Sequence, residues 1–307
     1  MLQRKKKFFD KKLLFYCCGL ALPILQYCIF YIYVNFNSFI LAFTNYDFYT
    51  QETTFAGFSK FQEVFYTFFE SQQSAQLMLS LKNSLITYAL NLIVGTGGAL
   101  IFSYYIYKQR AFSGLYKVIL FLPSVIPGVA LISMYKTSMS SWMLEIYNML
   151  AINDSPVSLL DRTDTAFFTV LLFSLFFGFG TQVLMYLGAM NKINPSISEA
   201  AKLDGASFLK EFWLITIPCI YSTLATFIVV GIAGIFTSDL GLYSFFSMNA
   251  PGPTHTLGYY LYRETQIYAT NQARWPYIAA VGLCFTAIVA PITLGLRAIL
   301  NKLDPME

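Results

Sequence analysis

Blocks of twenty or more mostly apolar residues recur along this 307-residue chain and limit what it can fold into. A helix of about 20 apolar residues crosses the hydrocarbon core of a bilayer. Charged residues make up only 12% of the chain, whereas about a quarter of a soluble domain is charged. The sequence therefore predicts an all-α, polytopic membrane protein with six transmembrane helices, at residues 13–43, 83–107, 115–138, 166–189, 212–237 and 277–300. The first run exceeds one hydrocarbon thickness, so its end is expected to leave the membrane or lie along its surface.

The positively charged residues predict the orientation. Fourteen of the twenty Lys and Arg residues lie on one side of the six spans, and six lie on the other. Segments rich in Lys and Arg stay in the cytoplasm, so both termini are predicted to be cytoplasmic. The expected organisation is a basic N-terminus (1–12), a first helix with an external segment (13–82), a core of five helices (83–300) containing a cytoplasmic loop (190–218), and a cytoplasmic tail (301–307).

The third predicted external segment, residues 238–276, contains Pro251 and Pro253 before a short helix that carries three tyrosines. Tyrosines at this position are typical of a headgroup boundary, and a docking surface for an outside partner is the alternative. His255 is the single histidine, and it is expected to be solvated. No cysteine or second histidine accompanies it to hold zinc.

Several functions are disfavoured by what the sequence lacks. No G-x-x-x-x-G-K-[ST] motif is present, so the chain is not expected to bind ATP itself. No catalytic constellation, metal site, cofactor or nucleic-acid partner is expected. The predicted spans also lack the deep ionisable groups that ion-coupled transporters use. Their deep polar residues are neutral, which suits either hydrogen bonds between helices or contact with a neutral solute; they are Asn91, Ser174, Thr181, Gln182 and Thr226.

The predicted cytoplasmic loop reads "NKINPSISEAAKLDGASFLKEFWLITIPCI" over residues 191–220. Pro195 is expected to end the preceding helix, and Ser196 with Glu199 has the spacing of a capping box. A helix of about two turns should follow, broken at the turn dipeptide Asp204-Gly205, with a second helix starting near Ser207. Small residues in this loop would let another protein approach the backbone closely, although an ordinary polar loop is the alternative.

The same loop resembles the EAA motif of the permease subunits of ATP-binding-cassette (ABC) importers, whose pattern is E-A-A-x-x-x-G, nine residues, then I-x-L-P. The residues in register are Glu199, Ala200, Ala201, Gly205, Ile215 and Pro218, with Ile217 where leucine is usual. Further matches to the carbohydrate branch are Asp204, Ala206 and Phe212. The segments "LKNSLITYALNLIVGTGGALIFSYYIY" and "YKVILFLPSVIPGVALISMYK" are similar to the start of the permease core in maltose-type sugar importers.

This resemblance implies a type I ABC importer permease that is not itself an enzyme. It implies two ATP-binding subunits inside the cell, an extracellular solute-binding protein and a second permease subunit, in a heterodimer, all assembled on the lipid bilayer. The residues expected at the ATPase-coupling interface are Glu199, Ala200, Ala201, Asp204 and Gly205. A Gly205→Asp substitution is expected to break coupling, because it introduces a side chain and a charge into a close contact.

The resemblance also implies that the spans on either side of this loop line the sugar path. They contain "FFGFGTQ" (176–182) and "VVGIAGIFTSDLG" (229–241). The candidate path residues are Phe177, Gly178, Thr181, Gln182, Gly231, Gly234 and Ser238, with Phe179 and Tyr186 as further aromatic candidates. The alternative is that the glycines only let helices pack closely. Two other functions stay open: import of another small solute, and a membrane scaffold or sensor that docks an ATPase without transporting anything.

Overall fold

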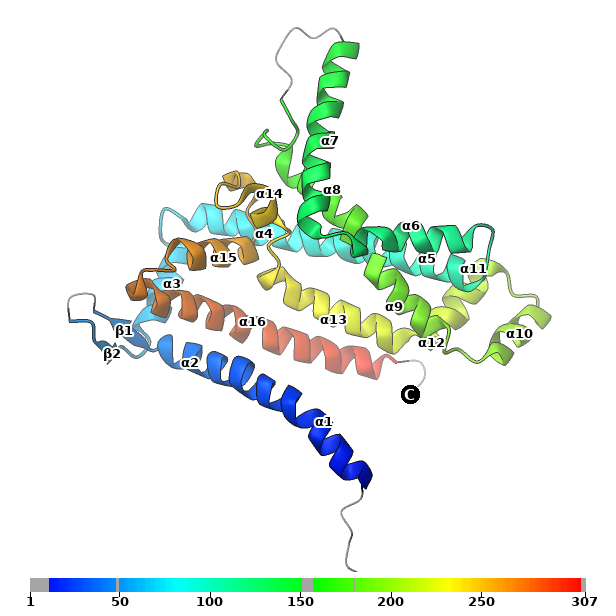
Figure 1. Ribbon diagram of the computed structural model, residues 1–307, viewed down its shortest axis with the longest axis horizontal. Coiled ribbons are helices and arrows are strands. Elements are labelled where there is room, and N and C mark those ends of the chain that lie inside the picture. The colour runs from blue at the N-terminus through cyan, green and yellow to red at the C-terminus, as the bar shows by residue number, and fades with distance from the viewer. Residues whose placement is uncertain (1–10, 48–49, 151–156, 179, 305–307) are drawn as a thin grey trace, which may run out of the picture. The chain divides into compact units, whose positions relative to one another are not determined.

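Helices form most of the chain in the computed structural model, which describes residues 11–47, 50–150, 157–178 and 180–304 (Figure 1). The chain divides into two structural units. Within the described residues, the first comprises 11–66 and 267–284, and the second comprises 67–266 and 285–304. The long helix α16 (Trp275–Lys302) starts in the first unit and continues into the second.

The first unit begins with a continuous helical stretch made of α1 (Lys11–Tyr27), the π-helical turn η1 (Cys28–Tyr33) and α2 (Val34–Leu41). Within it, Gly19–Leu41 is long and apolar enough to cross a membrane. None of the 18-residue apolar window in this segment is buried inside the chain. An apolar helix without buried residues is typical of one that faces lipid or another protein.

A small hairpin follows, in which β1 (Thr44–Tyr46) pairs antiparallel with β2 (Thr53–Phe55). The unit also contains most of α3 (Ser59–Phe69) and the 3₁₀ turn η5 (Gln272–Arg274). Arg274 donates to Glu63 at 2.8 Å, which joins the N-terminus of α16 to α3. This hairpin is the single sheet of the described chain and a small departure from the all-α prediction.

In the described part of the second unit, turns and loops join the helices, and no strand is present. Its long helices are α4 (Ser74–Leu90), α5 (Gly97–Tyr107), α6 (Ser113–Val125), α7 (Gly128–Met149), α8 (Ala166–Gly178), α9 (Gly180–Met190) and α13 (Tyr221–Thr237). The π-helical turn η2 (Asn91–Thr96) joins α4 to α5. The other elements are α10 (Pro195–Leu203), α11 (Phe208–Glu211), η3 (Phe212–Thr216), α12 (Ile217–Cys219), α14 (Leu242–Phe246), η4 (Gly252–Thr254) and α15 (Leu257–Ile267).

Four segments of the described chain are each long and apolar enough to cross a membrane alone: Gly19–Leu41, Ser74–Tyr107, Ala166–Met190 and Gln272–Lys302. In two further helix pairs, the two helices are long and apolar enough to cross a membrane only when they are taken together. Ser113–Val125 and Gly128–Tyr147 meet at 102°, and Phe208–Cys219 and Tyr221–Thr237 meet at 73°. If each bent pair crosses as one span, the number is six, as predicted.

The predicted spans at 115–138 and 212–237 are each bent in the structure, and prolines give the reason. Ile126 is extended at the end of α6, because a residue that precedes proline avoids the helical region, and Pro127 follows it. In the other pair, Pro218 lies two residues before Ile220, where the helix breaks. Proline removes one hydrogen bond from the helical ladder and weakens the helix there.

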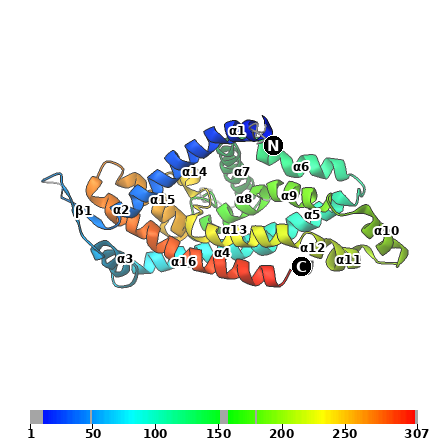
Figure 2. The ribbon, with the colours of Figure 1, turned by 90° about the horizontal axis from the view of Figure 1, so that it is seen from below.

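Two apolar clusters form the core of the second unit. The first joins α5, α9 and η3, with Tyr104, Tyr186, Met190 and Phe212 among its members. The second lies around α8, α14 and α15. The helix α13 packs beside α4 (Figure 2). These contacts set the positions of the EAA-like loop at residues 190–218 and of the helices α4, α9 and α13.

Candidate functional site

The helix α10 carries the start of the EAA-like motif, and Asn194 caps the N-terminus of this helix. The Asn194 side chain accepts a hydrogen bond from the backbone N–H of Ser196, at 3.1 Å. The expectation that Pro195 ends the preceding helix is wrong, because that helix ends at Met190 and Pro195 is the first residue of α10. Proline suits this position, since its fixed φ is helical and its missing N–H would have no helical partner. Asn194 thus takes the capping role that the sequence suggested for Ser196.

The turn after α10 is a Schellman motif. The N–H of Gly205 donates to the Lys202 carbonyl at 3.1 Å, and the N–H of Ala206 donates to the Ala201 carbonyl at 2.9 Å. Gly205 has φ +71°, a conformation that residues with a Cβ adopt only with strain. The predicted break at Gly205 is confirmed, and Ser207 then caps α11 by accepting from the N–H of Lys210.

The predicted coupling residues divide into two groups by exposure. Glu199, Ala200, Asp204 and Gly205 are exposed on the loop, whereas Ala201 is buried against the chain. Beside the exposed group, Leu203 has 89% of its side chain in contact with solvent.

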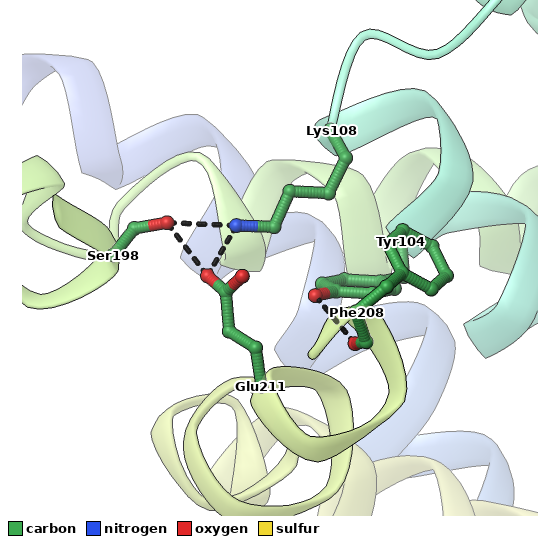
Figure 3. A network of polar contacts seen from close by, with 5 residues as sticks. All are labelled: Tyr104, Lys108, Ser198, Phe208 and Glu211. Carbon is green, nitrogen blue, oxygen red and sulfur yellow. Dashed lines mark hydrogen bonds and ion pairs between the residues drawn. The ribbon is translucent and has the colours of Figure 1, made fainter. Parts of the chain in front are cut away.

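A buried polar network holds this loop to the end of α5 (Figure 3). Lys108, which caps α5, forms an ion pair with Glu211 of α11 and donates to the Ser198 hydroxyl of α10 at 2.7 Å. Ser198 donates in turn to the Glu211 carboxylate at 2.6 Å. The side chains of Lys108 and Glu211 are only 12% and 7% exposed. Beside them, the Tyr104 hydroxyl donates to the Phe208 carbonyl at 3.1 Å. The end of α5 is thereby fixed to α10 and α11, which lie far from it in sequence.

A cavity of about 210 Å³ opens among α4, η2, α9 and α13. Its lining contains no charged side chain and consists of Ser84, Thr87, Tyr88, Asn91, Gln182, Gly231, Gly234, Ile235, Ser238 and Thr256. The structure thus brings four of the predicted path residues together: Gln182, Gly231, Gly234 and Ser238. The deep polar residue Asn91 joins them, while Ser84, Thr87, Tyr88, Ile235 and Thr256 were missed.

Two hydrogen-bonding atoms on this lining have no partner within the described chain: the Thr87 hydroxyl and the Gln182 side-chain carbonyl, both buried. Buried polar atoms are normally satisfied by protein, water or ligand. Because both groups are neutral and can accept hydrogen bonds, the cavity is suited to a hydroxyl-bearing, uncharged molecule.

The other predicted path residues lie outside this cavity. Phe177 packs against Phe173, with ring centroids 4.8 Å apart. Gly178 and Thr181 are exposed, and Tyr186 is buried in the first apolar cluster. Phe179 lies outside the described residues. The close-packing alternative applies to Gly180, where a Cβ would clash with the backbone carbonyl of Leu120.

The segment beyond α13 is tied to α4 by side-chain hydrogen bonds. The Asn83 amide donates to the carbonyls of Pro253 and His255, at 2.8 and 2.9 Å. His255 is buried rather than solvated, and its Nε2 donates to the Ala250 carbonyl at 3.0 Å. Burial lowers the pKa of the His255 imidazole. The short helix predicted after Pro253 is confirmed as α15.

The tyrosines of α15 do not form the surface that the sequence suggested. Tyr259 and Tyr260 are buried, and only Tyr262 is exposed. Both proposed roles, headgroup contact and docking, are therefore wrong for Tyr259 and Tyr260. In the described part of the chain, no group of three His, Cys, Asp or Glu side chains is placed to hold a metal ion.

The family model for "Binding-protein-dependent transport system inner membrane component" matches residues 91–305, which include the network, the EAA-like loop and most helices of the second unit. The chain belongs to this family. It is a multi-pass inner-membrane subunit of an ABC importer, and its role in that importer is transport rather than catalysis. The resemblance to importer permeases seen in the EAA-like motif is confirmed.

Curated relatives span most of the chain. It is similar to the arabinooligosaccharides transport system permease protein AraP of Bacillus subtilis (strain 168), with 23% identity over 88% of this chain and 83% of the relative. It is also similar to the multiple sugar-binding transport system permease protein MsmF of Streptococcus mutans serotype c, with 22% identity over 90% of this chain and 91% of the relative.

Solved structures share the fold. A crystal structure of a bacterial ABC transporter involved in the import of the acidic polysaccharide alginate matches 95% of this chain and 96% of that chain, with 22% identity and a TM-score of 0.72. A second crystal structure shows the alginate transporter in complex with an alginate pentasaccharide-bound periplasmic protein. It matches 98% of this chain and 99% of that chain, with 20% identity and a TM-score of 0.74. The type I importer permease fold is therefore confirmed.

Proposed function

We propose that this chain is one of two different permease subunits of an ABC importer for a sugar or oligosaccharide. The observation that carries the proposal is the uncharged, hydrogen-bonding cavity in a member of this transport family. Two of the relatives are named for arabinooligosaccharides and for multiple sugars. Neutral acceptors such as the Thr87 hydroxyl and the Gln182 carbonyl suit the hydroxyl groups of a carbohydrate.

The sugar passes through this cavity, lined by Gln182, Gly231, Gly234 and Ser238, in our proposal. Phe177, Gly178 and Thr181 belong to the span Ala166–Met190, as Gln182 does, but they lie outside the cavity. They would contact the sugar elsewhere along its route. A cavity of 210 Å³ is smaller than the roughly 300–1,000 Å³ of sites that enclose drug-sized ligands. It would hold a short part of an oligosaccharide at a time, so that a long chain would move through in steps.

The coupling loop between Met190 and Pro218 would dock an ATP-binding subunit. Its exposed residues Glu199, Ala200, Asp204 and Gly205, together with Leu203, present a small, stiff surface. Both termini would then be cytoplasmic, as the distribution of Lys and Arg indicates. Ala201 would act from beneath, by packing α10 against the rest of the chain. Two ATP-binding subunits would supply the energy, and an extracellular binding protein would deliver the sugar.

The test is to purify the tagged chain in mild detergent from its own cells and identify the proteins that come with it. Recovery of an ATP-binding subunit, a second permease and a solute-binding protein supports the importer. The binding protein is then screened against sugars, and the assembly is reconstituted in liposomes to measure ATP-driven uptake. Recovery of the ATP-binding subunit without any uptake would favour a scaffold or sensor. If the binding protein instead binds amino acids or ions, the proposed substrate changes from a sugar to that solute.

A further inference from the structure

The network of Lys108, Ser198 and Glu211 does more than stabilise the loop (Figure 3). We propose that Lys108 is a positioning residue that makes the coupling helix α10 and the helix α5 move as one body. Movement of α10 would thereby reach the sugar cavity through α5. This inference rests on the proposed function, in which α10 docks an ATP-binding subunit and the cavity carries the sugar.

The geometry gives α10 two routes to the cavity. The covalent route follows α11, η3 and α12 into α13, which carries Gly231 and Gly234. This route is bent by 73° at Ile220, two residues after Pro218. A break in the helical ladder is a place where a pushed helix can flex instead of transmitting the push.

The second route is non-covalent and passes through Lys108. Lys108 caps α5, and α5 is continuous with η2 and α4 in the single 34-residue segment Ser74–Tyr107. That segment carries Ser84, Thr87, Tyr88 and Asn91 of the cavity. From Asn91 to Lys108 it runs for about 25 Å at the usual rise per residue. A displacement of the loop would thus reach the cavity wall along one continuous helical segment, in which the π-helical turn η2 joins α4 to α5.

The chemistry of the network suits a link of fixed geometry. One Glu211 oxygen accepts from both Lys108 and Ser198, and Lys108 also lies 5.2 Å from the centre of the Tyr107 ring. The ammonium group is at the C-terminal end of α5, where the helix dipole favours a positive charge. Buried ion pairs add little net stability compared with apolar side chains, but they hold their partners in one arrangement. The pair therefore fits a positioning role better than a purely stabilising one.

Burial separates Lys108 and Glu211 from the docking surface. Lys108 and Glu211 are nearly buried, whereas Glu199, Ala200 and Gly205 are exposed. A substitution at Lys108 should consequently leave the surface that meets the ATP-binding subunit in place. Docking and transmission of movement can be measured apart for this reason.

The experiment uses the complete assembly in liposomes and measures three quantities: ATP-binding subunits retained, ATP hydrolysis stimulated by loaded binding protein, and sugar taken up per ATP. Lys108→Met removes the charge at similar length. It should leave subunit retention unchanged and lower uptake per ATP about tenfold, within the usual range of coupling between sites. Ser198→Ala, a milder change that removes one hydroxyl, should lower it less.

The matched control is Lys117→Met, which removes the same charge from an exposed lysine of α6, outside the loop, and should behave as wild type. The exchanged pair Lys108→Glu with Glu211→Lys should recover most of the uptake that Lys108→Met loses, which a general packing defect would not allow. Wild-type uptake per ATP in Lys108→Met overturns the inference, as does loss of ATPase retention or failure of the exchanged pair. A wild-type assembly without ATP-driven uptake refutes the proposed function instead, before any variant is compared.

Discussion

Gly231 gives the sharpest test of the cavity as the sugar path. A Cβ at this position would lie 2.8 Å from Cε2 of Tyr88 and 3.4 Å from its Cδ2. Carbon atoms prefer a separation of about 3.5–4.0 Å, so Gly231→Ala must displace the Tyr88 ring by roughly 0.7 Å. The ring can move, because its hydroxyl is held only by the Ile228 carbonyl at 3.4 Å, which is long for a hydrogen bond.

Two opposing effects decide the stability of Gly231→Ala. Alanine is favoured over glycine within a helix by about 1 kcal/mol. Overpacking against the Tyr88 ring costs about 1–3 kcal/mol. The unfolding temperature in detergent should therefore change little or fall slightly. Sugar uptake should change far more, since one extra methyl group in a specific pocket is worth about 1–3 kcal/mol, or roughly 10–200-fold.

The assay is uptake of a labelled sugar by cells that carry only the variant importer, with the amount of assembled protein measured in parallel. Gly188→Ala is the control, because Gly188 lies outside the cavity and its Cβ would meet nothing within 4 Å. Its uptake should stay within about twofold of wild type, as for changes that remove no contact. Equal uptake by the two variants would refute the assignment of this cavity to the sugar path.

Three further outcomes are expected. At Gly205, Asn tolerates positive φ, and the chain leaves room for a Cβ. Gly205→Asn should thus fold normally yet lose ATPase retention, as Gly205→Asp should. If both variants retain the ATP-binding subunit in a pull-down, Gly205 does not lie in a close contact with it. Because burial lowers the pKa of His255 below its ordinary 6.5, the folded state favours the neutral ring, and its stability should be full above about pH 6.5 and fall as pH drops through the lowered pKa. Unfolding temperatures between pH 8 and 5 check this, with His255→Gln expected to show less pH dependence. Asn83→Ala leaves the Pro253 and His255 carbonyls without their donor and should cost about 1–3 kcal/mol in thermal unfolding, whereas Ser80→Ala should cost less, because the Ser80 hydroxyl bonds only to its own helix.

The apolar runs and the loop motif could be predicted because each depends on neighbouring residues alone. Run length and hydropathy are sufficient to place transmembrane helices. The break at Gly205 follows from local turn chemistry, and the structure confirms it. The cap at Asn194 could also have been found, because Asn before Pro at the start of a helix is a known local pattern.

Other features depend on residues far apart in the sequence. Lys108 read only as one more positive charge at the end of a span, because nothing local points to Glu211. His255 is buried by contacts that include a residue of α4, which loop composition does not reveal. Half of the residues that line the cavity could be predicted, because glycines and neutral polar residues in a span indicate a helix face that can pack closely or contact a solute. Which of them face each other depends on how α4, α9 and α13 pack.

The bend between α6 and α7 has a consequence for the surroundings of the assembled importer. At 1.5 Å per residue, the 13 residues of α6 extend for about 20 Å, less than the roughly 30 Å of a hydrocarbon core. Val125 and Val129, on either side of the bend, are 65% and 72% exposed in the single chain. Irregular backbone is tolerated at membrane depth only where protein covers it or water reaches it. Wherever this corner lies within the bilayer, it must therefore be shielded from the acyl chains by a neighbouring subunit or by an aqueous channel.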